Sequence, residues 1–183
     1  DVRNNFQVTN DQVFVDGVMM PVARWPNVTP ANLTHLKNSD KAQVISATVV
    51  NTYTASYNDP ALNIFPTDFW KGAKINFGPG WSTVVTTCDV TGSTPGSVSF
   101  QCNPDPGSGN FRSSWDTVNT LVRPSAGNYY YLWGKSQALD APGEFFLDRA
   151  YNADGSLVSR RRPHAMLTDP EAMCRRAVAA VRD

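Results

Sequence analysis

The residues best suited to chemistry are carboxylates on either side of a turn. The segment LDAPGEFFLD carries Asp140, Glu144 and Asp148. Pro142 presets φ and Gly143 tolerates a positive φ, so the pair predicts a type II turn that brings Asp140 close to Glu144. Two interpretations stay open at this point. The carboxylates cap the turn through backbone N–H groups, or they form a pair that faces a sugar or a metal.

Aromatic side chains beside turn residues form a second candidate group. Five tryptophans contribute to an aromatic content of 11%. A tryptophan at a turn is often partly exposed, and its apolar face can cover a sugar ring while polar neighbours bind the hydroxyls. The alternative for Trp25 is a half-buried core ring with Arg24 stacked on it. The predicted substrate-binding residues are Arg24, Trp25 and Asn27, with Asp68, Trp70 and Trp81 as a second group.

Other catalytic patterns are missing from the sequence. It contains no HExxH, CxxC or GxSxG motif and no glycine-rich phosphate loop. The two histidines, His35 and His164, stand far apart, and neither has a nucleophile in a recognisable pattern beside it. We therefore predict no metal site and no cofactor, and the available chemistry rests on carboxylates and aromatic rings.

Composition limits the class of partner. The 183 residues are 41% hydrophobic and only 17% charged, and sixteen basic residues balance sixteen acidic ones. Without a net charge there is no global field to attract nucleic acid or an anionic membrane. No apolar run approaches the ~18 residues of a membrane span. The polar stretch from Asp1 has no signal-peptide pattern, as expected of a trimmed, secreted product.

Three cysteines fit an oxidising environment. Cys88 and Cys102 bracket a predicted hairpin, where a disulfide would close a loop of about 15 residues and stabilise the fold by roughly 3 kcal/mol. Cys174 is left as a free thiol or an intermolecular partner. Two sequons, at Asn27 and Asn32, permit N-glycosylation if the protein passes through a eukaryotic secretory route.

Short apolar runs separated by turn residues dominate the chain. The Asp-Gly pair at 16–17 predicts a hairpin over 13–23, and a loop is expected over 54–66. About nine such runs favour an all-β fold, an antiparallel β-sandwich or barrel. The main predicted strands are 43–53, 74–77, 81–90, 97–102 and 129–133.

The C-terminal tail differs in kind from the rest. Arginines at 160–162 indicate a linker or a surface run. Thr168, Pro170 and Glu171 are typical of a helix start, with a capping box, and an apolar stripe continues to about Arg182. We therefore divide the chain into an all-β domain over 1–157 and an arginine-rich linker with a short amphipathic helix over 158–183.

Three stretches together resemble a known family. They are VFVDGVMMPVARWPN (13–27), DFWKGAKI (68–75) and YYYLWGKSQALDAPGEFFLD (129–148), followed by DGSL (154–157). The set is similar to a β-domain of secreted proteins that carry a right-handed parallel β-helix and act on polysaccharides. That resemblance implies a link to glycoside hydrolases or lyases. The coiled β-helix that would carry their catalytic carboxylates has no counterpart in this chain.

Three functions are compatible with these patterns. The leading hypothesis is a secreted carbohydrate-binding or accessory domain that holds a polysaccharide. The second is a glycoside hydrolase or lyase that uses Asp140, Glu144 or Asp148, in which carboxylate separation would set the stereochemistry. The third is a structural or adhesive surface protein that self-associates through Cys174 or the terminal helix. Whether the chain is an enzyme stays open, with a non-catalytic role favoured.

Overall fold

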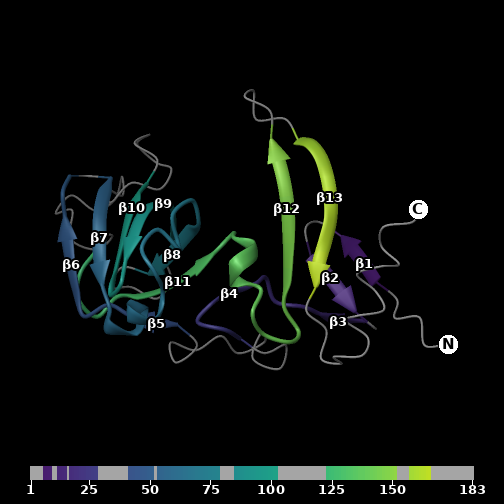
Figure 1. Cartoon of the computed structure of the whole chain (residues 1–183), viewed down its shortest axis with the longest axis horizontal. Coiled ribbons are helices and arrows are strands. Elements are labelled where there is room, and N and C mark those ends of the chain that lie inside the picture. The colour runs from purple at the N-terminus through teal and green to yellow at the C-terminus, as the bar shows by residue number, and fades with distance from the viewer. Residues whose placement is uncertain are drawn as a thin grey trace. The chain divides into compact units, whose positions relative to one another are not determined.

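The computed structural model divides the chain into two compact units. Unit 1 comprises Asp1–Leu36 and Gly134–Asp183, and unit 2 comprises Lys37–Trp133 (Figure 1). Each unit is described by itself. The structure describes residues 6–9, 12–15, 17–28, 41–51, 53–78, 85–102, 123–151 and 157–165.

Unit 1 begins with a small antiparallel sheet. Its order is β1-β2-β3. In the β2–β3 pair, Val15 faces Val18, and the intervening Gly17 has a φ of 79°, which glycine adopts without steric cost. The predicted hairpin over 13–23 is therefore present in its first half. The strands of this part are β1 (Phe6–Thr9), β2 (Gln12–Val15), β3 (Val18–Met19) and β4 (Arg24–Trp25).

The second part of unit 1 is a long antiparallel pair. A short 3-10 helix, η4 (Ser136–Ala138), precedes the turn that leads into β12 (Phe145–Tyr151), and β12 pairs with β13 (Leu157–Ala165). Figure 1 shows these two strands side by side. The described core of the unit joins both parts of its chain, because Val13 and Met20 pack with Phe145, all at least 95% buried.

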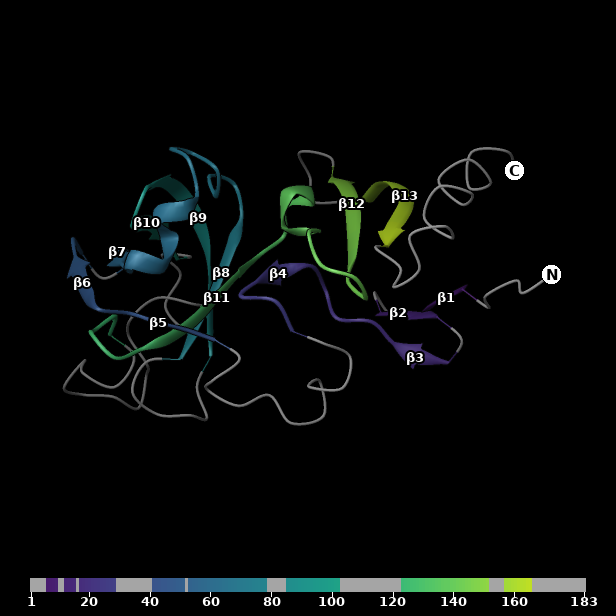
Figure 2. The same ribbon diagram turned by 60° about the horizontal axis from the view of Figure 1, so that its bottom comes forward.

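Unit 2 is built on one antiparallel sheet. Its strands follow the order β11-β8-β9-β10-β7-β6, with β5 paired to β11, as Figure 2 shows for β5 and β11. A 3-10 helix, η3 (Pro60–Ile64), follows β7. The strands are β5 (Ala42–Gln43), β6 (Ser46–Val49), β7 (Thr54–Asn58), β8 (Lys74–Gly78), β9 (Thr86–Thr94), β10 (Ser97–Gln101) and β11 (Tyr129–Trp133).

One face of this sheet forms the core of unit 2. Alternate residues of β8, β10 and β11 are buried, as the two-residue period of a half-buried strand requires. Tyr57 lies at the centre, with ring centroids 5.0 Å from Phe100 and 5.6 Å from Phe77 and from Tyr130. Edge-to-face and tilted pairs of this kind add about 0.5–1.5 kcal/mol each beyond the burial of their area.

Two buried tyrosines have hydroxyl groups that each donate a hydrogen bond to a side chain. Tyr130 Oη donates to Asp59 Oδ2 at 2.9 Å, and Tyr57 Oη donates to Asn128 Oδ1 at 2.9 Å. Burial raises the pKa of both phenols, and for Tyr130 the neighbouring Asp59 carboxylate adds to the rise. Asp59 also caps η3, since its Oδ1 accepts from the backbone N–H of Ala61 at 2.9 Å. Buried polar groups matched in this way fix the register of the sheet.

The all-β prediction is confirmed in its coarse form. The pairings among β1 to β3, among β5 to β11 and between β12 and β13 are antiparallel, and in the described residues the sheets do not close into a barrel. The expected helix after Thr168 falls outside the described residues. In the described part of the chain, no helix is long and apolar enough to span a membrane.

Two local predictions are wrong. The loop expected over 54–66 contains β7 and η3. The reason is tertiary, because β7 lies between β6 and β10 and buries Ala55 and Tyr57, while the Asp-Pro pair at 59–60 starts η3. The arginine run at 160–162, expected as a linker or a surface run, lies in β13, so the linker alternative is wrong, because β12 supplies the hydrogen-bonding partner strand.

Candidate functional site

Unit 1 brings two predicted groups of site residues together. Asn27 Nδ2 donates to Asp140 Oδ1 at 3.0 Å, across 113 residues of sequence. Asp140 precedes the turn that contains Gly143, whose φ is 88°, in agreement with the predicted turn residue. Glu144 follows directly and approaches the backbone of Arg24. The candidate site is thus made of residues 24–27 and 140–144.

Glu144 is the most unusual side chain of this site. It is 0% exposed, and neither carboxylate oxygen has a hydrogen-bond partner in the described residues. Burial, with a smaller contribution from the charge of Asp140, raises the pKa of this carboxyl to about 7. The backbone N–H groups of Arg24, Ala141 and Asp140 lie near enough to lower the pKa in part, without reaching hydrogen-bond geometry.

The first segment of the site is held by its own backbone contacts. Arg24 is buried, at 6% exposure, and its Nε donates to the carbonyl of Pro26 at 3.0 Å. The Trp25–Pro26 peptide bond is cis. Trp25 is half-buried, and Asn27 is exposed. The guanidinium is therefore engaged within the segment, as the packing interpretation of the Arg24–Trp25 pair expects, whereas Asn27 and Asp140 face outward.

The two described members of the second predicted binding group, Asp68 and Trp70, do not form an open aromatic site. Trp70 is 1% exposed and packs edge-on against Phe65 and Phe69, so its ring offers no face to a ligand and the prediction for Trp70 is wrong. The reason is that the turn containing Trp70 folds onto the sheet, where the backbone N–H of Trp70 donates to Ser93 Oγ at 3.0 Å. Asp68 is exposed and forms an ion pair with Lys71 at 3.8 Å. Trp81 lies outside the described residues.

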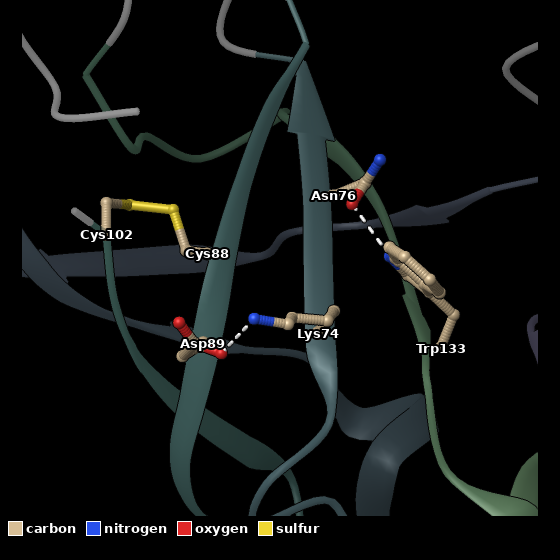
Figure 3. Close-up of polar contacts among 6 residues, drawn as sticks. All are labelled: Lys74, Asn76, Cys88, Asp89, Cys102 and Trp133. Carbon is tan, nitrogen blue, oxygen red and sulfur yellow. Dashed lines mark hydrogen bonds and ion pairs between the residues drawn. A yellow bond between two sulfur atoms is a disulfide. The ribbon is translucent and has the colours of Figure 1, made fainter. Parts of the chain in front are cut away.

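A polar and aromatic face on unit 2 was missed by sequence reasoning. Trp133 Nε1 donates to Asn76 Oδ1 at 2.8 Å, and Asn76 Nδ2 donates to Tyr131 Oη at 2.8 Å. Lys74 and Asp89 form an ion pair beside them (Figure 3). The signal was present in the alternation of the strands over 129–133 and 74–78. Every group here is paired with a neighbour, which is the pattern of a satisfied sheet surface.

The outcome differs among the remaining residues that were predicted from the sequence. Cys88 and Cys102 form a disulfide with a Cα–Cα distance of 4.3 Å, visible in Figure 3 between β9 and the end of β10. Asp148 belongs to β12, but its side chain is not among those described. The sequon at Asn27 is exposed. Asn32 and Cys174 lie outside the described residues, so their predicted roles stay predictions.

The site offers proton chemistry between carboxylates. Among the described side chains, no group of three or more His, Cys, Asp or Glu residues is close enough to bind a metal ion. Asp140 and Glu144 instead form a pair with contrasting surroundings, one exposed and one buried. Environments that separate the pKa values of two carboxyls are typical of acid–base sites, although structural sites produce them as well.

Comparison with known proteins gives a match in the C-terminal third of the chain. The sequence profile of the LamB/YcsF family matches residues 118–183. This segment includes Asp140 and Glu144 and excludes residues 24–27. No solved structure matches the chain.

Curated relatives carry a consistent name, that of one particular subunit of 5-oxoprolinase. The 5-oxoprolinase subunit from Limosilactobacillus fermentum is 48% identical over 56 residues, which are 31% of this chain and 22% of that protein. The corresponding subunit from Acinetobacter baylyi is 43% identical over 58 residues, 32% of this chain and 23% of that protein. The chain therefore spans about a fifth of the length of the curated relatives it matches.

These matches overturn the functional hypotheses drawn from short motifs. The resemblance to a secreted polysaccharide-active β-helix protein is wrong, since the chain matches the LamB/YcsF family and subunits of 5-oxoprolinase. The carbohydrate-binding function, its glycoside hydrolase or lyase alternative, the adhesive alternative and the polysaccharide partner are withdrawn with it. The physical reason is that Trp-Pro and Pro-Gly motifs specify turns, which many folds share.

Proposed function

We propose that this chain serves a 5-oxoprolinase-type enzyme as part of one of its subunits, and that residues 118–183 carry that role. The observation that supports the proposal is the 48% identity to the Limosilactobacillus fermentum protein over 56 residues, together with the family match over 118–183. The name of the relatives indicates an enzyme of more than one subunit that acts on 5-oxoproline. Partner subunits are therefore part of the proposal.

The chemistry of such a substrate defines what a site must supply. 5-Oxoproline is a five-membered cyclic amide that bears a carboxylate. When water opens the ring, a C–O bond forms, the C–N bond breaks and glutamate results. One group must accept a proton from water and one must deliver a proton to the leaving nitrogen, and carboxyl groups can perform both tasks.

Asp140 and Glu144 are the carboxyls of the matched segment that we assign to this role. Asp140 is exposed and is the one able to contact a substrate. Glu144 is 0% exposed, so it acts as a positioning residue through Asp140. The two carboxyls interact, because the charge of Asp140 raises the pKa of Glu144.

The test is a segment exchange. Residues 118–183 replace the matched segment of the Limosilactobacillus fermentum protein, and glutamate formation from 5-oxoproline is measured in the complete enzyme. Turnover within about tenfold of the native enzyme supports the proposal, since a displaced catalytic group costs more than that. A folded hybrid that assembles but has no turnover contradicts it.

Two variants of the hybrid test the roles that we assign to Asp140 and Glu144. Asp140→Asn should abolish turnover, and Glu144→Gln should shift the pH profile as well as its height. Gln137→Ala, at an exposed position of η4, is the matched control and should leave turnover unchanged. An unaltered pH profile in Glu144→Gln would remove Glu144 from the assignment.

Other predictions from the sequence also remain proposals. They are the sandwich arrangement, the domain boundary at residue 157, the helix from Thr168 to about Arg182, and a secreted location. The Cys88–Cys102 disulfide supports maturation in an oxidising compartment. Mass measurement of the natural protein without reductant would test this, because a reduced Cys88–Cys102 pair adds two hydrogen masses and counts against export.

A further inference from the structure

Two chain segments of unit 1 that are remote in sequence meet at a short backbone seam. The N–H of Ala23 donates to the carbonyl of Phe145 at 2.6 Å, and the N–H of Phe145 donates to the carbonyl of Pro21 at 3.0 Å. Val22 and Phe145 form an isolated parallel bridge. We name residues 21–23 and 145 the 21–23/145 seam. It joins β12 to the segment that follows β3.

Glu144 is close to both of the segments that form this seam. It directly precedes Phe145 in the chain, and its carboxyl approaches the backbone N–H of Arg24, the residue after Ala23. The side chain is 0% exposed, and both of its oxygens lack a hydrogen-bond partner in the described residues. A buried neutral carboxyl without partners costs a few kcal/mol, and an ionised one costs far more.

Burial outweighs the groups that favour a negative charge on Glu144, which are the backbone N–H groups of Arg24, Asp140 and Ala141. The charge that acts on it is the Asp140 carboxylate on the preceding turn, which is unfavourable to ionisation. Arg24 contributes its backbone N–H, while its guanidinium Nε donates to Pro26. The described core beside the seam is apolar, formed by Val13, Met20 and Phe145. Ionised Glu144 therefore gains stability by reaching water.

We propose that the protonation state of Glu144 controls whether the 21–23/145 seam of unit 1 is closed or open. We call this switch the clasp. With the carboxyl protonated, the side chain stays buried and the 21–23/145 seam stays closed. When the proton is lost to solvent, the charged carboxylate draws the 140–144 turn outward and the two seam hydrogen bonds open. The pKa of about 7 places this change close to neutral pH. The clasp involves the same two carboxyls as the enzymatic role proposed above, but its test measures no enzymatic activity and can fail separately.

Amide hydrogen exchange of the full chain tests the clasp directly. The observables are the protection factors of the Ala23 and Phe145 amides between pH 4 and pH 8, after correction for the intrinsic exchange rate. They should fall progressively as the pH rises from about 4.5 to about 7 and then level off. The fall should exceed tenfold, with a limit of about 300-fold set by a shift from 4.5 to 7. The amides of Val90 and Cys102, hydrogen-bonded within unit 2, should show no such step.

Two variants separate the clasp from a general effect of pH. Glu144→Gln keeps the shape without the proton equilibrium, so the step should vanish. Asp140→Asn removes the unfavourable neighbouring charge, so the step should move to lower pH. Should Glu144→Gln fail to fold, the direction of the Asp140→Asn shift decides. Flat protection at Ala23 and Phe145 in the natural chain overturns the clasp. A step that persists in Glu144→Gln, or that stays in place in Asp140→Asn, does so as well.

Discussion

The side-chain amide of Asn27 and the carboxylate of Asp140 meet at 3.0 Å, although 113 residues separate them in the chain. The contact is exposed and joins the segment after β4 to the turn before β12. A hydrogen bond to a charged group in solvent stabilises the fold only modestly. The contact becomes repulsive, however, if a second carboxylate replaces the amide. It gives a direct test of the geometry of the candidate site.

Substitutions at the contact between Asn27 and Asp140 should change the free energy of unfolding measurably. Asn27→Ala should lower the free energy of unfolding by about 0.5–1 kcal/mol. Asn27→Asp should cost more, because it places two carboxylates against each other. Adding Asp140→Asn to Asn27→Asp should restore most of the loss. Urea denaturation of the four proteins provides the measurement, and failure of the double variant to recover would show that the two side chains do not interact.

The buried Glu144 carboxyl should make the whole protein more stable in weak acid. Its pKa is raised from 4.5 to about 7 in the folded chain. The folded state therefore binds the proton more tightly, and its stabilisation is complete below about pH 4.5 and is lost as the pH rises through 7. The difference is at most about 3 kcal/mol. Glu144→Gln should flatten this dependence in denaturation series at pH 4 to 8, whereas Asp68→Asn, at an exposed carboxylate, should leave it intact.

The two buried tyrosines of unit 2 should differ in their tolerance to loss of the hydroxyl. Tyr130→Phe removes the donor to Asp59 Oδ2 and should cost about 2–3 kcal/mol, because a buried charge-assisted bond is lost. Tyr57→Phe should cost about 1 kcal/mol, since Asn128 Oδ1 still accepts from the backbone N–H of Ser125 at 2.8 Å. Equal losses in thermal or urea unfolding would contradict this ranking.

Removal of the disulfide should lower the stability of unit 2, because the unfolded chain gains conformational entropy. Cys88 and Cys102 are 14 residues apart and close the loop from β9 through β10. Replacing both by alanine should lower stability by about 3 kcal/mol. Cys174→Ser is the matched control and should leave stability unchanged. A double variant as stable as the natural chain would mean that the bridge adds nothing beyond the sheet hydrogen bonds.

The turn at Pro142–Gly143 shows how far local sequence reaches. Gly143 has the positive φ that its residue type predicted, and the strands predicted over 129–133, from its bulky run, and over 74–77 are present in the structure. These features depend on neighbours in the chain, so residue type and spacing suffice. The same reasoning failed for 54–58, because that strand exists only by pairing with β6 and β10.

What the sequence alone determined was the all-β class, the Gly143 turn and the pairing of Cys88 with Cys102. Tertiary structure decided which polar groups are buried: Trp70 lies in the core, and Glu144 lies beside the seam between segments more than a hundred residues apart. Burial and long-range contact arise from the folded path of the whole chain. A motif of five or ten residues carries no information about that path, which is why the turn was predictable and the environment of its carboxyl was not.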